Sequence, residues 1–240
     1  MAVRGDQESN TGIYSDDFSK NDGSGEDGLG SWWTYYDPVA PASVGVSHEG
    51  QGTSDAFVVI DVDSGDEHDT WYPLTALQLY QDTNDVDLEI VASFESIPGA
   101  PQYEICGIYA QDSVAGYHIQ VVALRLTASS ELKINIDRCD NSPTSWNNVG
   151  SGTVDQSPST IQLHLDRTGD VWLARWGTDG GGPTNMSGGT LALNIDRVGI
   201  LTGNAAAENA FTNKVDYFWE DRESITIEDP LSSRRVMVIT

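Results

Sequence analysis

Short stretches in which apolar and polar residues alternate recur along the chain from residue 14 onward. Glu131–Asp137 places Leu132, Ile134 and Ile136 on one side and polar residues on the other, and Thr160–Arg167 repeats this pattern. Successive side chains of a β-strand point to opposite faces of a sheet, so each stretch predicts a strand with one buried and one wet face. The other predicted strands are Phe57–Val62, Asp87–Phe94, Tyr103–Ala110, Tyr117–Leu126, Asp170–Trp176, Leu191–Leu201 and Lys214–Glu220.

Turn residues separate these strands, and no segment keeps an apolar residue at the 3.6-residue period of a helix. Gln111–Gly116 predicts a hairpin-like turn, and Thr168–Gly169 a tight one. Many short strands between turns are typical of an all-β sandwich or barrel. We therefore expect one antiparallel β-sandwich domain over residues 14–226, preceded by a polar arm, 1–13, and followed by a tail, 227–240.

The net charge of the chain argues against some classes of binding partner. Its 240 residues include 37 acidic and 12 basic side chains, for a net charge of −25. Nucleic acids and anionic membranes are polyanions, so neither is an expected partner. Self-repulsion at this charge weakens a compact state, and concentrated salt relieves it. The composition therefore favours a high-salt habitat, with an ordinary acidic extracellular or virion protein as the alternative.

Two further features of the sequence bear on where the protein is located. No apolar run approaches the roughly 20 residues of a membrane helix. The first twelve residues, MAVRGDQESNTG, lack the apolar core of a secretory signal. A virion or extracellular location without a signal peptide is the expectation.

The order of several short motifs resembles the concanavalin A-like lectin/glucanase superfamily, and most of all its small jelly-roll modules of the laminin-G or DUF1349 kind. The motifs are Asp16-Asp17-Phe18, Trp32-Trp33, His68-Asp69-Thr70-Trp71, Asp85-Val86-Asp87-Leu88-Glu89, Cys106-Gly107-Ile108 before Tyr117, Arg167-Thr168-Gly169-Asp170-Val171-Trp172 before Asp179-Gly180, and Val198-Gly199-Ile200 before Phe211 and Asp216-Tyr217-Phe218. The resemblance covers roughly residues 14–226 and implies a jelly-roll sandwich. Members of the superfamily bind sugars, hydrolyse glycans, mediate adhesion or build structure, so the fold alone does not decide function.

Three acids provide the candidate catalytic set. Asp85, Asp87 and Glu89 would share one face of a strand, with neighbours about 6.6 Å apart, and paired carboxylates at such distances can hydrolyse glycosidic bonds. The resemblance implies a Glu-x-Asp-x-Glu strand in laminarinase-like enzymes, whereas the first position here is Asp85. We therefore expect no catalysis, and a solvated strand face instead.

Aromatic residues beside polar ones indicate sugar binding. His68, Asp69 and Trp71 could combine an indole platform with hydrogen bonds to hydroxyl groups, and Trp146 is a further stacking candidate. The alternative for the His68–Trp71 segment is a loop packed on the sandwich edge. No cofactor is required. A structural Ca²⁺ would suit carboxylate ligands, and Asp16, Asp17 and Asp216 could meet if the first and last strands pair.

The tail has a different character from the rest of the chain. Leu231–Thr240 contains the only adjacent basic pair, Arg234-Arg235, and ends in five uncharged residues of high β propensity. Such a segment suits strand addition to an acidic partner, either in another subunit or on its own sheet edge.

Together these features predict a non-catalytic, lectin-like surface or attachment protein. The expected setting is the virion of a virus of a salt-loving host, as a turret, fibre or tail component. Its expected partners are a glycan or cell-surface polysaccharide, and other virion proteins or further copies through the tail. The alternatives are a glycoside hydrolase of laminarinase type and a cell-surface carbohydrate-binding protein.

Overall fold

Strands make up all the regular secondary structure in the described part of the chain. The computed structural model describes residues 7–8, 12–19, 29–39, 45–50, 52–53, 55–65, 67–70, 75–95, 98, 104–125, 132–139, 146–154, 158–204 and 210–220. The strands are β1 (Gln7–Glu8), β2 (Tyr14–Ser15), β3 (Thr34–Tyr36), β4 (Val46–Glu49), β5 (Phe57–Val62), β6 (Leu77–Asp82), β7 (Leu88–Phe94), β8 (Glu104–Asp112), β9 (Tyr117–Leu124), β10 (Leu132–Cys139), β11 (Trp146–Val154), β12 (Ile161–Thr168), β13 (Val171–Thr178), β14 (Thr184–Thr190), β15 (Arg197–Asn204) and β16 (Phe211–Glu220). No helix in these residues is long and apolar enough to cross a membrane.

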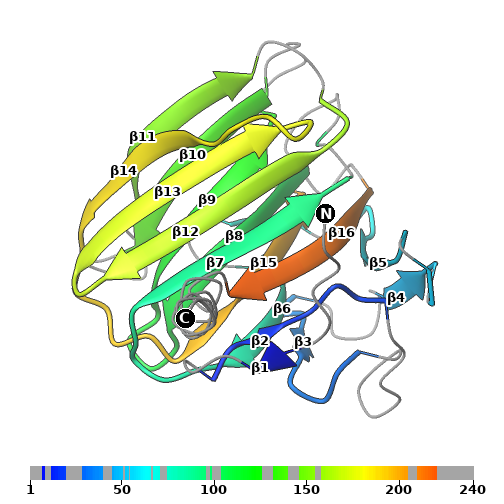
Figure 1. The fold of residues 1–240 in the computed structure, drawn as a ribbon, viewed down its shortest axis with the longest axis horizontal. Helices are drawn as coiled ribbons and strands as arrows, with labels where there is room; N and C mark the ends of the chain where they lie inside the picture. The colour runs from blue at the N-terminus through cyan, green and yellow to red at the C-terminus, as the bar shows by residue number, and fades with distance from the viewer. Residues whose placement is uncertain are drawn as a thin grey trace, which may run out of the picture.

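Two antiparallel sheets of seven strands each face one another, with sheet II in front of sheet I in Figure 1. We call the first sheet I, with the order β11-β10-β9-β8-β15-β6-β3, and the second sheet II, with the order β14-β13-β12-β7-β16-β5-β4. This arrangement confirms the predicted antiparallel β-sandwich of jelly-roll type. A separate pair, β1 and β2, aligns Gln7 with Ser15 and Glu8 with Tyr14.

The main core fills the space between the sheets. Phe94, Trp172 and Phe218 are among its largest fully buried side chains, and they belong to β7, β13 and β16 of sheet II. Sheet I contributes alternate residues of its strands, such as Ile108 and Val121. The period-2 pattern in the sequence therefore marks the inward face of each strand.

Glycines let the two sheets approach each other where β11 and β14 form their edges. A Cβ on Gly188 would lie 2.8 Å from Ile136 Cδ1 and 2.9 Å from Trp172 Cβ, and a Cβ on Gly150 would lie 2.8 Å from Ile136 Cγ2. A side chain at either position would collide with the core. The glycine content of β11 and β14 is thus a requirement of packing.

The two ends of the sandwich are joined. Asp16 and Phe218 exchange backbone hydrogen bonds of 2.7 and 2.9 Å, and the Glu220 N–H donates to Ser15 Oγ. The first and last parts of the sandwich therefore meet, as the sequence predicted for a jelly roll.

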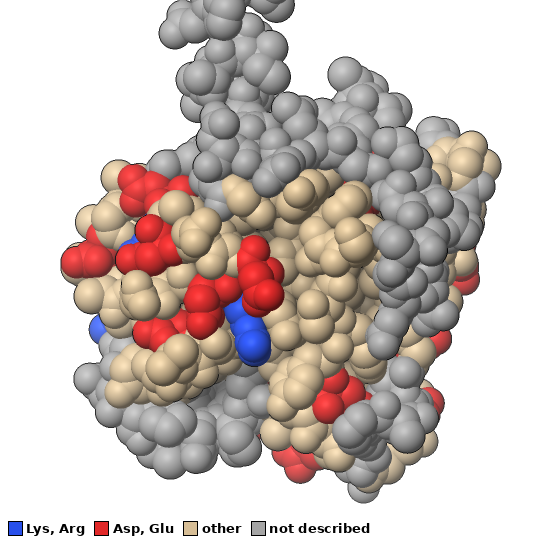
Figure 2. Space-filling view, turned by 90° about the horizontal axis from the view of Figure 1, so that it is seen from below, with Lys and Arg blue, Asp and Glu red and all other residues tan. Residues whose placement is uncertain are grey.

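Figure 2 shows the molecule from below, relative to the view in Figure 1. Acidic side chains gather around a basic one on part of this surface, and uncharged residues cover much of the rest.

Candidate functional site

Three central strands of sheet I carry polar side chains on the face that points away from the core. Ile119 and Val121 of β9 pack in the main core, so His118 and Gln120 project to the opposite face. Pairing places Gln111 of β8 opposite His118, and Asp137 of β10 opposite Gln120. We call Gln111, His118, Gln120 and Asp137 the polar row.

Three members of the polar row are buried and Gln111 is half-buried, and each member has one buried polar atom without a hydrogen-bond partner in the described structure. His118 is 4% exposed, while Gln120 and Asp137 are 1% exposed. The atoms concerned are Gln111 Oε1, His118 Nδ1, Gln120 Oε1 and Asp137 Oδ2. Buried polar atoms nearly always have a partner, so four such atoms on adjacent strands indicate a place for water or a ligand.

All four atoms are hydrogen-bond acceptors, with the glutamine amides oriented as assigned in the structure. Burial lowers the pKa of His118 to about 4, against a hydrogen bond with the Thr70 backbone that raises it. The imidazole is therefore neutral at pH 7. With one ring nitrogen protonated, as that hydrogen bond favours, Nδ1 can accept a proton donor.

Asp137 supplies the charge of the row. Burial raises its pKa to about 6, although hydrogen bonds from Asn148 and Gln120 oppose the shift. The Asn148 amide donates to Asp137 Oδ1 at 2.8 Å, and a β-bulge next to Asp137 sets their register. Asp137 is the single carboxyl residue on this face among the described residues of β8–β10, so the face lacks the carboxylate pair that glycoside hydrolysis needs.

The predicted sugar platform forms an anchored loop. His68 Nε2 lies 3.2 Å from Asp37 Oδ1, and both side chains are 1% exposed. His68 and Asn204 form an isolated bridge, and the Asp69 carbonyl accepts the N–H groups of Thr75 and Ala76. The segment is thus fixed to the ends of β15 and β6, and the buried His68 side chain contacts Asp37.

Two further predicted sugar contacts, Trp71 and the side chain of Trp146, lie outside the described residues. The hydrogen bond between His118 and the Thr70 backbone connects the loop to the polar row. The loop that contains His68 and Thr70 therefore contacts the polar row at His118.

The three candidate catalytic acids are held separately. Strand β7 begins at Leu88, so Asp85 and Asp87 precede it and only Glu89 lies within it. Asp85 forms a 2.5 Å ion pair with Arg167, Asp87 Oδ1 accepts the Gly169 N–H at 2.6 Å, and Glu89 pairs with Arg175. Each acid has its own cation or amide partner, which does not suit a shared acid and nucleophile role.

The acids predicted to bind calcium are partly brought together. Asp16 Oδ1 accepts a hydrogen bond from the Phe18 N–H at 2.7 Å, and Oδ2 accepts one from the Trp33 indole N–H at 2.8 Å. The pKa of Asp216 is raised to about 6 by burial and by the charges of Glu95, Asp17 and Asp55. The described residues contain no group of three or more side chains arranged to hold a metal ion. A calcium site remains a prediction from the sequence.

Sequence reasoning missed the polar row, although one signal was available. Strand β9 reads YHIQVVAL, and His118 and Gln120 interrupt an otherwise apolar run. A strand of this kind is buried on both faces, so polar residues inside it are exceptions that need an explanation. Both cysteines, Cys106 and Cys139, are buried thiols.

The chain matches no protein-family model and no curated protein. Its fold is similar to that of several solved structures. The GH43 protein BlXynB of Bacillus licheniformis has a TM-score of 0.59 at 13% identity, over 85% of this chain and 38% of that one. The β-glucanase of Bacillus licheniformis has a TM-score of 0.51 at 8% identity, over 79% and 92% of the two chains. The CBM2 module of the evolved Dit of Lactobacillus casei BL23 phage J-1 has a TM-score of 0.50 at 9% identity, over 79% and 90%.

These likenesses agree with the observed jelly-roll sandwich. This chain spans well under half of the GH43 protein, 38%. The broad resemblance to concanavalin A-like folds holds at the level of architecture, and the narrower laminin-G or DUF1349 kind is not confirmed.

Proposed function

We propose that this chain is a non-catalytic carbohydrate-binding protein in which the polar row receives hydroxyl groups of a glycan. The observation that carries the proposal is the set of four buried acceptor atoms without a partner in the described structure. Acceptors require donors, and a sugar presents several hydroxyl donors on one edge. Residues directly opposite on paired strands lie about 5 Å apart, so one sugar residue can contact more than one of them.

The charge of the site supports a neutral ligand. At pH 7 the row contains the anionic Asp137 and a neutral His118, in a chain of net charge −25. An anionic ligand would meet repulsion both at the site and at long range. A neutral, donor-rich ligand meets neither.

The same arrangement disfavours hydrolysis. The polar row has one carboxylate, and Asp85, Asp87 and Glu89 each have a separate partner. A retaining or inverting mechanism uses two carboxyl groups across the scissile bond. The laminarinase-type alternative therefore has less support than binding.

The biological setting that we propose is the surface of a virion, as an attachment component of a virus whose host lives in high salt. The charge of −25 supports the salt requirement. One structure of similar fold is the CBM2 module of a phage protein, the evolved Dit of phage J-1. A cell-surface carbohydrate-binding protein is the alternative, and the genes that neighbour this one would distinguish the two.

A glycan array probed in molar salt tests the proposal. Gln120→Leu removes one acceptor of the polar row, and Gln162→Leu is the matched control, because Gln162 contacts Tyr217 on the outer face of sheet II. We expect the first variant to weaken retention at least about tenfold and the second to leave it unchanged. Equal binding by both variants would remove the polar row from the site, and an array without any bound glycan would refute carbohydrate binding.

A further inference from the structure

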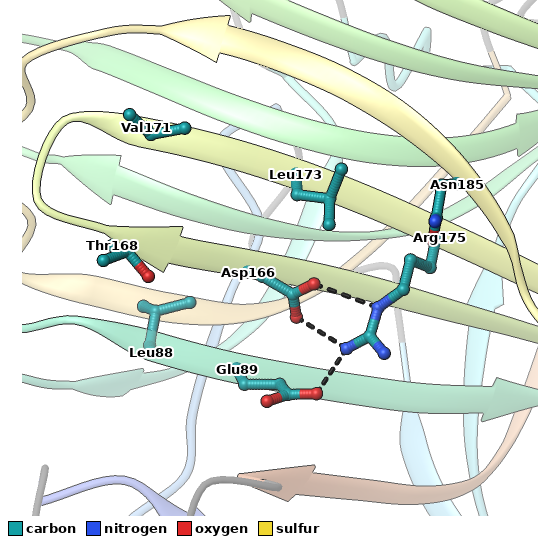
Figure 3. A pocket seen from close by; sticks show the side chains of 8 residues that line it. All are labelled: Leu88, Glu89, Asp166, Thr168, Val171, Leu173, Arg175 and Asn185. Carbon is teal, nitrogen blue, oxygen red and sulfur yellow. Dashed lines mark hydrogen bonds and ion pairs between the residues drawn. The ribbon is translucent and has the colours of Figure 1, made fainter.

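The outer face of sheet II has an open pocket that the proposed glycan site does not use. The pocket has a volume of about 540 Å³ and lies over β7, β12, β13 and β14 (Figure 3). Leu163 and Leu165 of β12 point into the main core, so Asp166 and Thr168 project outward together with their cross-strand neighbours. Its lining residues are Leu88, Glu89, Asp166, Thr168, Val171, Leu173, Arg175 and Asn185.

One half of the pocket is anionic. Arg175 donates from Nε and Nη2 to the two carboxylate oxygens of Asp166, each at 3.0 Å, and from Nη2 to Glu89 Oε1 as well (Figure 3). Two carboxylates thus face one guanidinium, which leaves one net negative charge. Glu89 Oε2 has no hydrogen-bond partner among the described residues, so it can accept a bond from a further cation.

The other half of the pocket is apolar and exposed. Val171 is 58% exposed and Leu173 is 37% exposed, and both belong to β13. Pairing places Leu173 opposite Asp166 and Val171 opposite Thr168. The pocket therefore suits a segment in which a basic residue stands next to apolar ones, because the aliphatic stem of an arginine packs on apolar surface while its head pairs with carboxylate.

The chain contains one segment with this chemistry. Residues 231–240 read LSSRRVMVIT, with a charge of +2 from Arg234 and Arg235 and no acidic residue. The rest of the chain is strongly acidic, so this segment complements the pocket in charge and in its apolar, β-branched residues. We propose that residues 231–240 dock in this pocket of their own chain, with Arg234 or Arg235 at Glu89.

The place where the described chain ends supports docking within one chain. Glu220, the last residue of β16, accepts the Glu89 N–H through Oε1 at 3.2 Å, so the chain leaves the sheet beside the pocket. Asp166 lies two strands away, about 10 Å. The 14 residues from Glu220 to Arg234 reach up to about 46 Å when extended. A tether of this length supplies an effective concentration that separate chains match only at millimolar levels.

Limited digestion of the full chain with trypsin tests the docking. Trypsin cleaves after arginine, so docking protects the bonds after Arg234 and Arg235, and cleavage after Arg4 serves as the internal reference. Glu89→Gln should accelerate tail cleavage about threefold to fivefold relative to the reference, as expected for loss of one exposed ion pair. The matched control is Glu49→Gln, which removes an ion pair with Lys214 elsewhere on sheet II and should leave the tail rate unchanged.

A second variant separates docking from a change in the sheet itself. Leu173→Ser alters the exposed apolar half and should accelerate tail cleavage in the same way, with an unfolding midpoint close to that of the wild type. Equal tail rates in the wild type and in both pocket variants would overturn the proposal. Protection that appears only as the protein concentration rises would also overturn it, in favour of a second copy as the source of the tail. Neither result depends on glycan binding, so this test is independent of the array.

Discussion

Replacement of Asp137 by asparagine should stabilise the protein above pH 6 and have little effect below pH 4. The folded protein holds the Asp137 proton more tightly than the unfolded chain, because burial raises the pKa from its ordinary value of 3.8 to about 6. Between these two values the folded state binds more protons, so the free energy of unfolding falls as the pH rises. Above pH 6 the contribution of Asp137 to the free energy of unfolding no longer changes with pH.

The size of this effect follows from the same two pKa values. Each pKa unit corresponds to about 1.4 kcal/mol, so the folded protein should lose about 3 kcal/mol from this group between pH 4 and pH 6. Asp137 is 1% exposed, so solvent screens little of this energy. Asparagine keeps an oxygen for the 2.8 Å bond from Asn148 and has no charge to bury, so the variant should lack this loss.

Urea unfolding at several pH values in constant molar salt measures the difference. Asp216 is the main interfering group, because its pKa is also raised to about 6 by burial and neighbouring acids. Asp216→Asn alone, and combined with Asp137→Asn, separates the two contributions. Asp179→Asn is a control of opposite sign, since hydrogen bonds from Ser159 lower the pKa of Asp179. Parallel curves for the wild type and Asp137→Asn between pH 4 and pH 6 would refute the burial argument.

Three further predictions concern salt, catalysis and packing. The unfolding midpoint should rise from low to molar salt, because salt screens a net charge of −25, and a flat or falling midpoint would contradict this. Incubation with laminarin should release no reducing sugar, whereas release that Glu89→Gln abolishes would restore the hydrolase alternative. Gly199→Ala should destabilise the fold by about 1–3 kcal/mol, since a Cβ there would lie 2.2 Å from the Leu79 carbonyl oxygen. Gly182→Ala, which has nothing within 4 Å, should change stability by less than about 0.5 kcal/mol.

The strands that carry core side chains could be predicted from the sequence. Phe57–Val62 matches β5 residue for residue, and Tyr117–Leu126 overruns β9 by two residues. These two strands are visible in the sequence as runs of apolar residues, whereas β12 is visible by alternation, because one face of β12 packs into the core. Strands β11 and β14 gave no such signal, since their glycines serve the close approach of the sheets at Ile136 and Trp172.

The chemistry of the site was harder to predict than the fold. The acids at 85, 87 and 89 have the spacing of a strand, yet Asp85 is paired with Arg167, which lies 82 residues away in the sequence. The polar row likewise depends on strand register between β8, β9 and β10. Local spacing contains no information on such pairings, whereas His118 and Gln120 in an apolar strand were visible as exceptions.

The joining of Asp16 to Phe218 has a consequence for how this sandwich can be combined with other proteins. Asp16 and Phe218, near the two chain ends of the described sandwich, lie side by side and are held by two backbone hydrogen bonds. A unit with adjacent ends can be inserted into a surface loop of a host protein without stretching that loop. Grafted in this way, residues 14–220 would form a lateral branch on a fibre or shell subunit, and the fold of the host would remain continuous on either side.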